Sequence, residues 1–298
     1  MKEFDIVLLT EERYDKPVLI TDYIRNILLD DEILTAALNA VGLKVIRKNW
    51  ADPDFDWASA EFAFFRTTWN YFNHFDKFQN WLNITSGQTK FVNTINTIRW
   101  NMDKHYLADL KNNNIHVVET YFIEKNDPRT LTEISGQFKT EFLILKPAVS
   151  GAARQTYKLS SGTILQHEEI YKSLIANESM LLQPFQQNII EQGEVAMMVI
   201  GGKFTHAVLK KAKQGDFRVQ DDFGGTLHAY QPSLEEIEFA ESAVRAWDPQ
   251  PVYGRVDIIR DNQDKLAIME LELIEPELWF RRNPSAADLL ASEILKLF

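Results

Sequence analysis

The sequence predicts a mixed α/β protein, α+β over the chain as a whole, and two patterns carry this prediction. In the first hundred residues, strand-like apolar runs alternate with a helical pattern, which is typical of an open α/β sheet. In the last hundred residues, apolar runs come in pairs joined by short turns, which is typical of antiparallel hairpins. The 298 residues are 45% hydrophobic and 25% charged, as in ordinary soluble globular proteins.

The N-terminal elements follow one another as strand, helix, strand and strand. Residues 4–9 are predicted to form a buried strand. Residues 30–41 have apolar side chains at helical spacing, and Gly42 stands where a helix C-cap is expected. Residues 43–47 and 62–65 are predicted to form the second and third strands.

The segment after the third predicted strand is a candidate substrate site. Ligands on open α/β sheets usually bind at the carboxyl ends of strands. Arg66, Trp69 and Tyr71 occupy that position and could bind a small carboxylate. Packing at the rim of the sheet is the open alternative for these side chains.

The middle and end of the chain continue with recognisable elements. The loop at 148–153 consists of small residues and follows Lys146, so its backbone N–H groups could cradle an anion. The predicted elements are a helix over 101–113, strands over 142–146 and 180–185, a hairpin of 194–200 with 203–210 about Gly201-Gly202, and a terminal helix over 285–298.

A second hairpin, formed by residues 252–260 and 265–275, carries a cluster of acids. We assume a register that pairs Arg260 with Lys265, and side chains alternate between the two faces of a strand. One face is then apolar. The other face carries the following side chains: Tyr253, Arg255, Asp257, Ile268, Glu270 and Glu272.

The three carboxylates on one face form a candidate metal site. Like charges directly opposite one another on a sheet cost stability, and a hard divalent cation would remove that cost. Magnesium suits a few carboxylates together with phosphate oxygens, and manganese could substitute for it. A half-exposed sheet whose acids Asp257, Glu270 and Glu272 merely face water is the open alternative.

Composition excludes several other classes of protein. A net charge of −11 gives no basic excess for nucleic-acid binding. The absence of cysteine removes disulfides, thiolate nucleophiles and cysteine zinc sites, and no second His stands at metal-ligand spacing from His206. P-loop, GxGxxG and GxSxG motifs are absent. No signal-like start or membrane-spanning run is present, which indicates a cytoplasmic protein without a membrane partner.

Four cations are candidates for binding phosphate groups: Lys104, Lys146, Lys210 and Arg218. Lys146 is the least ordinary of them, because it ends an apolar strand directly before the small-residue loop. Solvated surface positions are the open alternative, since Lys and Arg side chains are mostly exposed.

Taken in order, these motifs resemble the ATP-grasp superfamily, especially the branch that contains glutathione synthetase and the D-cycloserine-forming ligase of antibiotic biosynthesis. The resemblance covers roughly residues 95–298, and the first 95 residues resemble the family only in pattern. The matching stretches are Asp103-Lys104, Leu145-Lys146-Pro147 with its loop, Gln183-Pro184-Phe185, Gly193-Glu194, His206 through Lys210, Gly215 through Arg218 with Gly224-Gly225, Arg255-Val256-Asp257, and Met269 through Pro276.

The resemblance implies an ATP-grasp fold in three parts. Residues 1–95 would form an open α/β domain on the substrate side. Residues 96–185 would form the central lid, in which about 112–185 moves, and residues 186–298 the C-terminal antiparallel-sheet domain with the metal site.

The resemblance also implies a role for each matching residue. The ATP-binding residues would be Lys104, Lys146, Ser150, Gly151, Ala152, Gln183, Pro184, Phe185, Glu194 and Lys210. Glu194 would lie near the ribose, with Glu191 as a rival. Lys210, Arg218 and Arg255 would act on the transferring phosphate. Asp257, Glu270 and Glu272 would ligate two magnesium ions, although glutathione synthetases usually have Asn at the last position.

The implied activity is that of an ATP- and magnesium-dependent carboxylate–amine ligase. Such an enzyme forms an acyl phosphate on a small amino-acid-like substrate and releases ADP and phosphate. Two alternatives remain open: a ligase that adds an amino acid to a peptide or protein, and a nucleotide-binding regulator without catalysis. The expected partners are small carboxylates and amines, with a homodimer as an option by analogy with relatives.

Overall fold

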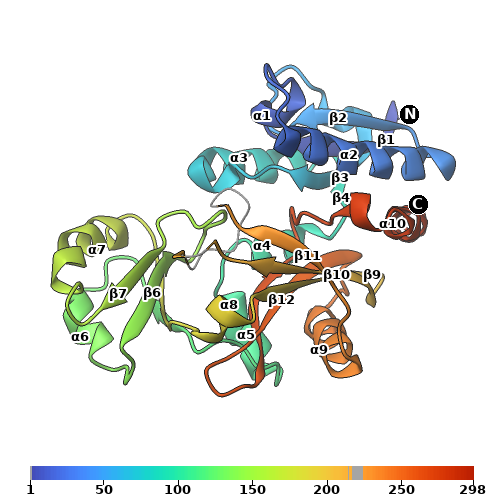
Figure 1. Cartoon of the computed structure of the whole chain (residues 1–298). Coiled ribbons are helices and arrows are strands. Elements are labelled where there is room, and N and C mark those ends of the chain that lie inside the picture. Colours follow the sequence, from blue (N-terminus) through green and yellow to red (C-terminus); the bar gives the residue numbers. More distant parts are fainter. Residues whose placement is uncertain (1, 214, 217–223) are drawn as a thin grey trace.

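A computed structural model describes residues 2–213, 215–216 and 224–298 of the chain. The described residues form three β-sheets with helices packed around them (Figure 1). Arg218 of the predicted site lies outside the described residues. In the described part of the chain, no helix is long and apolar enough to cross a membrane.

The N-terminal sheet is open and parallel, as the alternation of strands and helix predicts. Its strands are ordered β2-β1-β3-β4 and every pair is parallel. The elements are β1 (Phe4–Thr10), α1 (Glu12–Asp15), α2 (Asp22–Ala40), β2 (Val45–Asn49), β3 (Ala60–Thr67), α3 (Phe75–Thr85) and β4 (Lys90–Phe91).

Helix α2 begins eight residues before the predicted start at residue 30. Thr21 caps the helix, since its hydroxyl accepts a hydrogen bond from the backbone N–H of Ile24 at 3.2 Å. Ile24 and Ile27 continue the buried stripe toward the N-terminus. The polar residues between them hide this extension in the sequence.

The central sheet is antiparallel, with the order β5-β8-β6-β7. Its elements are β5 (Tyr121–Ile123), α6 (Leu131–Ser135), β6 (Phe142–Pro147), β7 (Tyr157–Ser160), α7 (Glu168–Ile175) and β8 (Met180–Pro184). Ile123, Leu131, Leu145 and Leu182 pack in a hydrophobic cluster that belongs to this sheet and its two helices. We refer to this unit as the lid.

The C-terminal sheet is also antiparallel, with the order β11-β10-β9-β12-β13. Its strands are β9 (Glu194–Ile200), β10 (Lys203–Lys211), β11 (Thr226–Tyr230), β12 (Tyr253–Arg260) and β13 (Leu266–Glu272). The predicted turn at Gly201-Gly202 is confirmed, and both residues have positive φ angles of 57° and 75°, as a two-residue hairpin turn of this type requires.

The helices of the second half complete the fold: α4 (Ile95–Asn101), α5 (Tyr106–Asn112), α8 (Asn188–Glu191), α9 (Leu234–Arg245) and α10 (Ser285–Leu295). Leu107 and Leu110 of α5 pack in the same hydrophobic cluster as Ile268 of β13. Helix α5 therefore lies on the C-terminal sheet, whereas the lid cluster is built from residues 121–182. The division of the chain into three units by residue number stays a prediction.

The register assumed for the β12–β13 hairpin is wrong. Arg260 pairs with Leu266 rather than with Lys265, and Asp257 lies opposite Glu270. Asp257 and Glu270 are therefore direct cross-strand neighbours, and Glu272 lies opposite Arg255.

A β-bulge in this hairpin determines which side chains of β13 lie on which face. The register shifts between Asp257 and Ile258, so that Ile258 pairs with Ile268 and Met269 is the extra residue. Ile268 consequently lies in the apolar cluster and not on the acid face. Met269, expected on the apolar face, lines the cavity described below. A one-residue change of register reverses the face of a side chain, and no sequence period reveals where the change occurs.

One hydrophobic cluster joins the N-terminal sheet to the C-terminal sheet. Leu8 of β1 and Leu34 of α2 share this cluster with Met198 of β9 and Leu290 of α10. The two units are therefore packed through a common core. The lid has a core of its own and also meets the C-terminal sheet in a smaller cluster that contains Ile144 and Ile259.

Candidate active site

A cavity lies where the three sheets meet. The N-terminal sheet and the loops after it contribute Glu11, Trp69, Tyr71 and other side chains to its wall. The lid contributes Ile144, Lys146 and the loop 150–153, and the C-terminal sheet contributes the acidic hairpin. The predicted nucleotide, metal and substrate segments thus meet at one place, with the exceptions given below.

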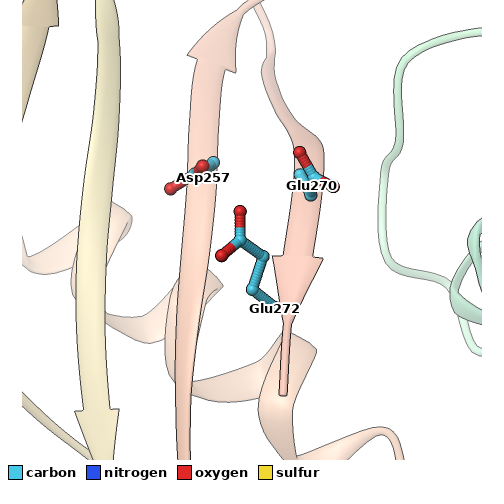
Figure 2. Close-up of side chains that lie close together, drawn as sticks. All are labelled: Asp257, Glu270 and Glu272. Carbon is cyan, nitrogen blue, oxygen red and sulfur yellow. The ribbon is translucent and has the colours of Figure 1, made fainter. Parts of the chain in front are cut away.

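Three carboxylates form the acidic part of the cavity. Asp257 lies on β12, and Glu270 and Glu272 lie on the neighbouring β13 (Figure 2). One oxygen from each side chain can be chosen so that all lie within 4.8 Å of one another. Oxygen ligands at this spacing suit a hard divalent cation.

Lys210 stands between two acids in the cavity. Its ammonium lies 2.7 Å from a carboxylate oxygen of Asp257 and 2.5 Å from Glu194. The position follows from register, because Lys210 on β10 pairs with Glu194 on β9, and β12 adjoins β9 on its other side. Three neighbouring strands therefore bring three charges into contact.

Arg255 and Lys104 neutralise the remaining acids. Arg255 donates to both oxygens of Asp257 at 2.9 Å and forms a short ion pair with Glu272. The ammonium of Lys104 lies 2.8 Å from Glu270. Each of the three candidate metal ligands is therefore paired with at least one cation.

The acids of the cluster differ in pKa. Burial raises the pKa of Glu272 to about 7, against the opposing effect of Arg255. Burial also acts on Asp257, but Arg255 and Lys210 outweigh it and hold the pKa of that carboxyl below its usual value. Lys104 and Lys146 likewise outweigh burial at Glu270 and lower its pKa. Glu272 is the member of the cluster that loses its charge most easily.

Lys146 lies on β6 of the lid, and Lys104 contacts the loop that follows this strand. Burial, opposed by Glu270 and assisted by the nearby charge of Lys104, lowers the pKa of Lys146 to about 8. Lys104 donates to the backbone carbonyl of Ser150 at 2.5 Å. Ala152 and Ala153 have positive φ angles of 49° and 53°, and consecutive left-handed residues turn backbone N–H groups inward, which suits anion binding.

The segment Gln183–Phe185 lies along another wall of the cavity. Gln183 donates to the hydroxyl of Thr120 at 2.7 Å. Lys158 covers the ring of Phe185 at 3.6 Å from its centroid. The wall combines the amides of Gln183 and Gln186 with the apolar side chains of Phe185 and Ile189.

Glu194 and its rival Glu191 occupy different surroundings. Glu194 is buried and lines the cavity, where burial raises its pKa in spite of Lys210. Glu191 is exposed on α8 and does not line the cavity.

Two of the three predicted substrate residues reach the cavity. Trp69 lines it and donates from its indole nitrogen to the backbone carbonyl of Glu275 at 2.8 Å. Tyr71 also lines it, and burial together with Glu275 raises the pKa of this tyrosine well above its usual value. Arg66 does not line it. Its side chain is 2% exposed and forms an ion pair with Asp31 at 3.2 Å.

Sequence reasoning missed several cavity residues. From the N-terminal unit these are Glu11, Arg13, Tyr14 and Tyr23, and from the segment after β13 they are Glu275, Glu277 and Trp279. Burial raises the pKa of Glu11 to about 7 and that of Glu275 to about 8. Glu11 directly follows β1, so the rule that ligands bind at the carboxyl ends of strands points to it.

Comparison with known proteins finds two family models that match separate parts of the chain. The model of the D-cycloserine synthetase DcsG N-terminal domain matches residues 6–93, and the model of the RimK-like ATP-grasp domain matches residues 155–278. Residues 155–278 therefore match an ATP-grasp domain, and the predicted resemblance to ATP-grasp ligases and the predicted fold class are both confirmed.

Individual relatives are distant in sequence. The cycloserine biosynthesis protein DcsG of Streptomyces lavendulae is 24% identical over 263 residues, which cover 82% of this chain and 86% of that protein. The crystal structure of D-cycloserine synthetase DcsG has a TM-score of 0.86 at 22% identity and covers 98% of this chain and 99% of its own. D-alanine–D-alanine ligase from Bacillus anthracis has a TM-score of 0.66 at 13% identity, over 98% of this chain and 96% of its own, and shares the fold.

Proposed function

We propose that the protein is an ATP- and magnesium-dependent carboxylate–amine ligase that releases ADP and phosphate. One observation carries this proposal: a single cavity holds Lys104 and Lys146 beside the acids Asp257, Glu270 and Glu272. Cations suited to a polyphosphate and carboxylates suited to a divalent metal, brought together in one cavity, are the parts that binding of a metal–nucleotide complex requires. The match of residues 155–278 to the RimK-like ATP-grasp domain supports the same activity.

The acidic cluster fits magnesium, or manganese in its place, since all three donors are carboxylate oxygens on two rigid strands. Asp257 and Glu270 would be the principal ligands, because their pKa values are held low. Glu272 would join them once its charge is stabilised. When bound, two metal ions would neutralise charge on the phosphate oxygens.

The side chains around the cluster have distinct roles in this proposal. Lys104 and Lys146 bind the nucleotide phosphates, and the loop over residues 150–152 covers them. Gln183 through Phe185 hold the base, and Glu194 holds the ribose. Lys210 and Arg255 stabilise the transferring phosphoryl group, as does Arg218, for which the sequence resemblance is the support.

The proposed reaction has two steps, for which the cavity positions ATP, the carboxylate and the amine. A carboxylate oxygen of the substrate attacks the γ-phosphorus of ATP, the bond to the β-phosphate oxygen breaks, and ADP leaves. The amine nitrogen then attacks the acyl carbon, loses a proton, and expels inorganic phosphate through a tetrahedral intermediate. Catalysis of both steps consists of positioning and charge stabilisation by preorganised cations.

The substrate side of the cavity supports a small amino-acid-like molecule. Trp69 and Tyr71 provide aromatic surface, and Glu11 and Glu275 provide carboxyls that suit an amino group. The relative DcsG is a cycloserine biosynthesis protein, and this is compatible with a small substrate.

An ADP-release assay against amino acids, dipeptides, peptides and polyamines tests the proposal. We expect magnesium-dependent release with at least one amino acid or dipeptide, and no release by the Asp257→Asn variant. Release with peptides alone would indicate a macromolecular acceptor. ATP binding without release on any substrate would contradict a ligase and support a regulator.

A further inference from the structure

The loop 148–153 touches the N-terminal unit. Val149 packs against the hydrophobic cluster that contains Phe72 and Phe78. A Cβ atom placed on Gly151 would lie only 2.6 Å from Cε1 of the Phe72 ring. The backbone of this loop therefore lies directly against an aromatic side chain that belongs to another part of the fold.

The requirement for glycine at position 151 is steric. Unlike its neighbours Ala152 and Ala153, Gly151 is not among the residues with a positive φ angle. Every other amino acid would place a carbon atom inside the contact distance of the Phe72 ring. The absence of a Cβ atom at Gly151 therefore allows the Phe72 ring to lie directly against the loop.

Phe72 is fixed from behind by the N-terminal unit. It lies in the short turn Tyr71–Asn73 after β3, is 7% exposed, and meets the ring of Tyr71 edge to face at 5.5 Å. On the other side of the loop, Lys104 holds the carbonyl of Ser150 at 2.5 Å. The loop is thus held between Lys104 and Phe72.

We infer that Phe72 is a positioning residue that holds the 148–153 loop closed over the cavity. The Phe72 ring lines the cavity, and in this assignment it acts on the loop through Gly151 and Val149. Tyr71, its neighbour in the chain, faces the substrate side of the cavity, so the packing of that side reaches the loop through Phe72. That the ligand is a nucleotide rests on the proposed function, whereas the contact between Phe72 and the 148–153 loop does not.

The test uses the full-length protein and two measurements. Amide hydrogen exchange reports the loop in the free protein, and calorimetric titration with Mg²⁺ and AMPPNP reports nucleotide affinity. In Phe72→Ala we expect about tenfold faster exchange at Arg154 and Thr156, whose amides donate to the loop carbonyls of Gly151 and Ala153. We also expect about tenfold weaker binding, because the closed loop is populated less. Phe72→Leu should give smaller changes in the same direction and guards against loss of folding.

Phe75→Ala is the matched control. Phe75 packs against the same hydrophobic cluster but does not line the cavity. It should leave loop exchange and nucleotide affinity unchanged. Equal effects of Phe72→Ala and Phe75→Ala, or unchanged exchange in Phe72→Ala, would overturn the inference.

A double-mutant cycle provides a second test of the contact between Gly151 and Phe72. Gly151→Ala alone should weaken binding, because its methyl group collides with the ring and displaces the loop. Combined with Phe72→Ala it should bind no worse than Phe72→Ala alone, and additive losses would contradict the contact. If the wild-type protein binds no nucleotide, the proposed function fails, whereas loop exchange still decides the role of Phe72.

Discussion

At the scale of single residues, the cavity is a set of mutually neutralising charges. Lys210 pairs with Asp257 and Glu194, and Lys104 pairs with Glu270. Buried charges are stable only when paired, and removal of one partner leaves the other uncompensated. Each substitution in this cavity therefore affects both the charge that is removed and the charge that remains.

Loss of Lys146 or Glu270 should abolish most turnover. Removing one preorganised charge contact raises a barrier by about 2.7–4 kcal/mol, which lowers kcat by roughly 10²–10³-fold. Steady-state ADP release by Lys146→Ala and Glu270→Ala checks this, with circular dichroism to show that the fold is intact. Lys125→Ala, at an exposed position on the lid, is the control. Near-normal turnover in both site variants would contradict the site assignment.

Nucleotide affinity should fall as pH rises through 8. Burial lowers the pKa of Lys146 to about 8, so its ammonium is present below that pH and is lost above it in the free protein. Phosphate binding requires the charged form, which makes binding at pH 9 about tenfold weaker than at pH 7. Titration with Mg²⁺ and AMPPNP between pH 7 and 9 measures this.

In Lys146→Arg the same pH dependence should disappear, because the guanidinium stays charged throughout the range. A slope that persists in this variant would assign the titration to other groups, of which Glu275 is the nearest candidate by pKa.

At the scale of elements, the close packing of β9 against β10 depends on a glycine. Gly193 has a φ angle of 86°, and a Cβ there would lie 2.6 Å from the carbonyl oxygen of Lys210. It directly precedes Glu194, the first residue of β9 and a partner of Lys210. The glycine therefore allows the two strands to begin their pairing at the cavity.

Gly193→Ala should destabilise the protein by about 2–5 kcal/mol, the sum of left-handed strain and steric overlap. Gly42→Ala is the control, because Gly42 has a similar φ angle of 87° but no atom within 4 Å of its added Cβ. It should cost only about 1–2 kcal/mol. Denaturant unfolding of both variants measures the difference, and equal losses would contradict the overlap at Lys210.

At the scale of the whole molecule, the N-terminal and C-terminal sheets behave as one packed body. Leu34 of α2 and Leu290 of α10 are fully buried in their common cluster, and Arg281 forms an ion pair with Asp30 across the same junction at 2.6 Å. The lid keeps a separate cluster. A lid with its own core can open without breaking the other two units apart.

Leu34→Ala should therefore lower the stability of both sheets together, by about 2–5 kcal/mol for a fully buried leucine. Leu131→Ala, which is equally buried but belongs to the lid cluster, should increase exchange in the lid alone. Native-state hydrogen exchange resolves the two patterns. Faster exchange confined to the N-terminal unit in Leu34→Ala would show that the common core does not couple the sheets.

The local pattern of apolar residues in the sequence by itself determined many of the strands and helices of this protein. Alternation and helical spacing predicted the open N-terminal sheet, the two C-terminal hairpins and the terminal helix. The order of the motifs predicted the superfamily. These features depend on neighbours in the chain, because the strand and helix periods are set by backbone geometry alone.

Other features depend on the tertiary structure, because the strand and helix periods of the sequence do not reveal them. The bulge at Asp257 placed Met269 in the cavity and Ile268 in the core, and long-range packing buried Arg66 against Asp31 instead of presenting it to the cavity. It also brought Glu11 to the wall of the same cavity as the acidic hairpin. These outcomes depend on which surfaces meet across the fold, and that is set by the joint packing of distant segments rather than by any one of them.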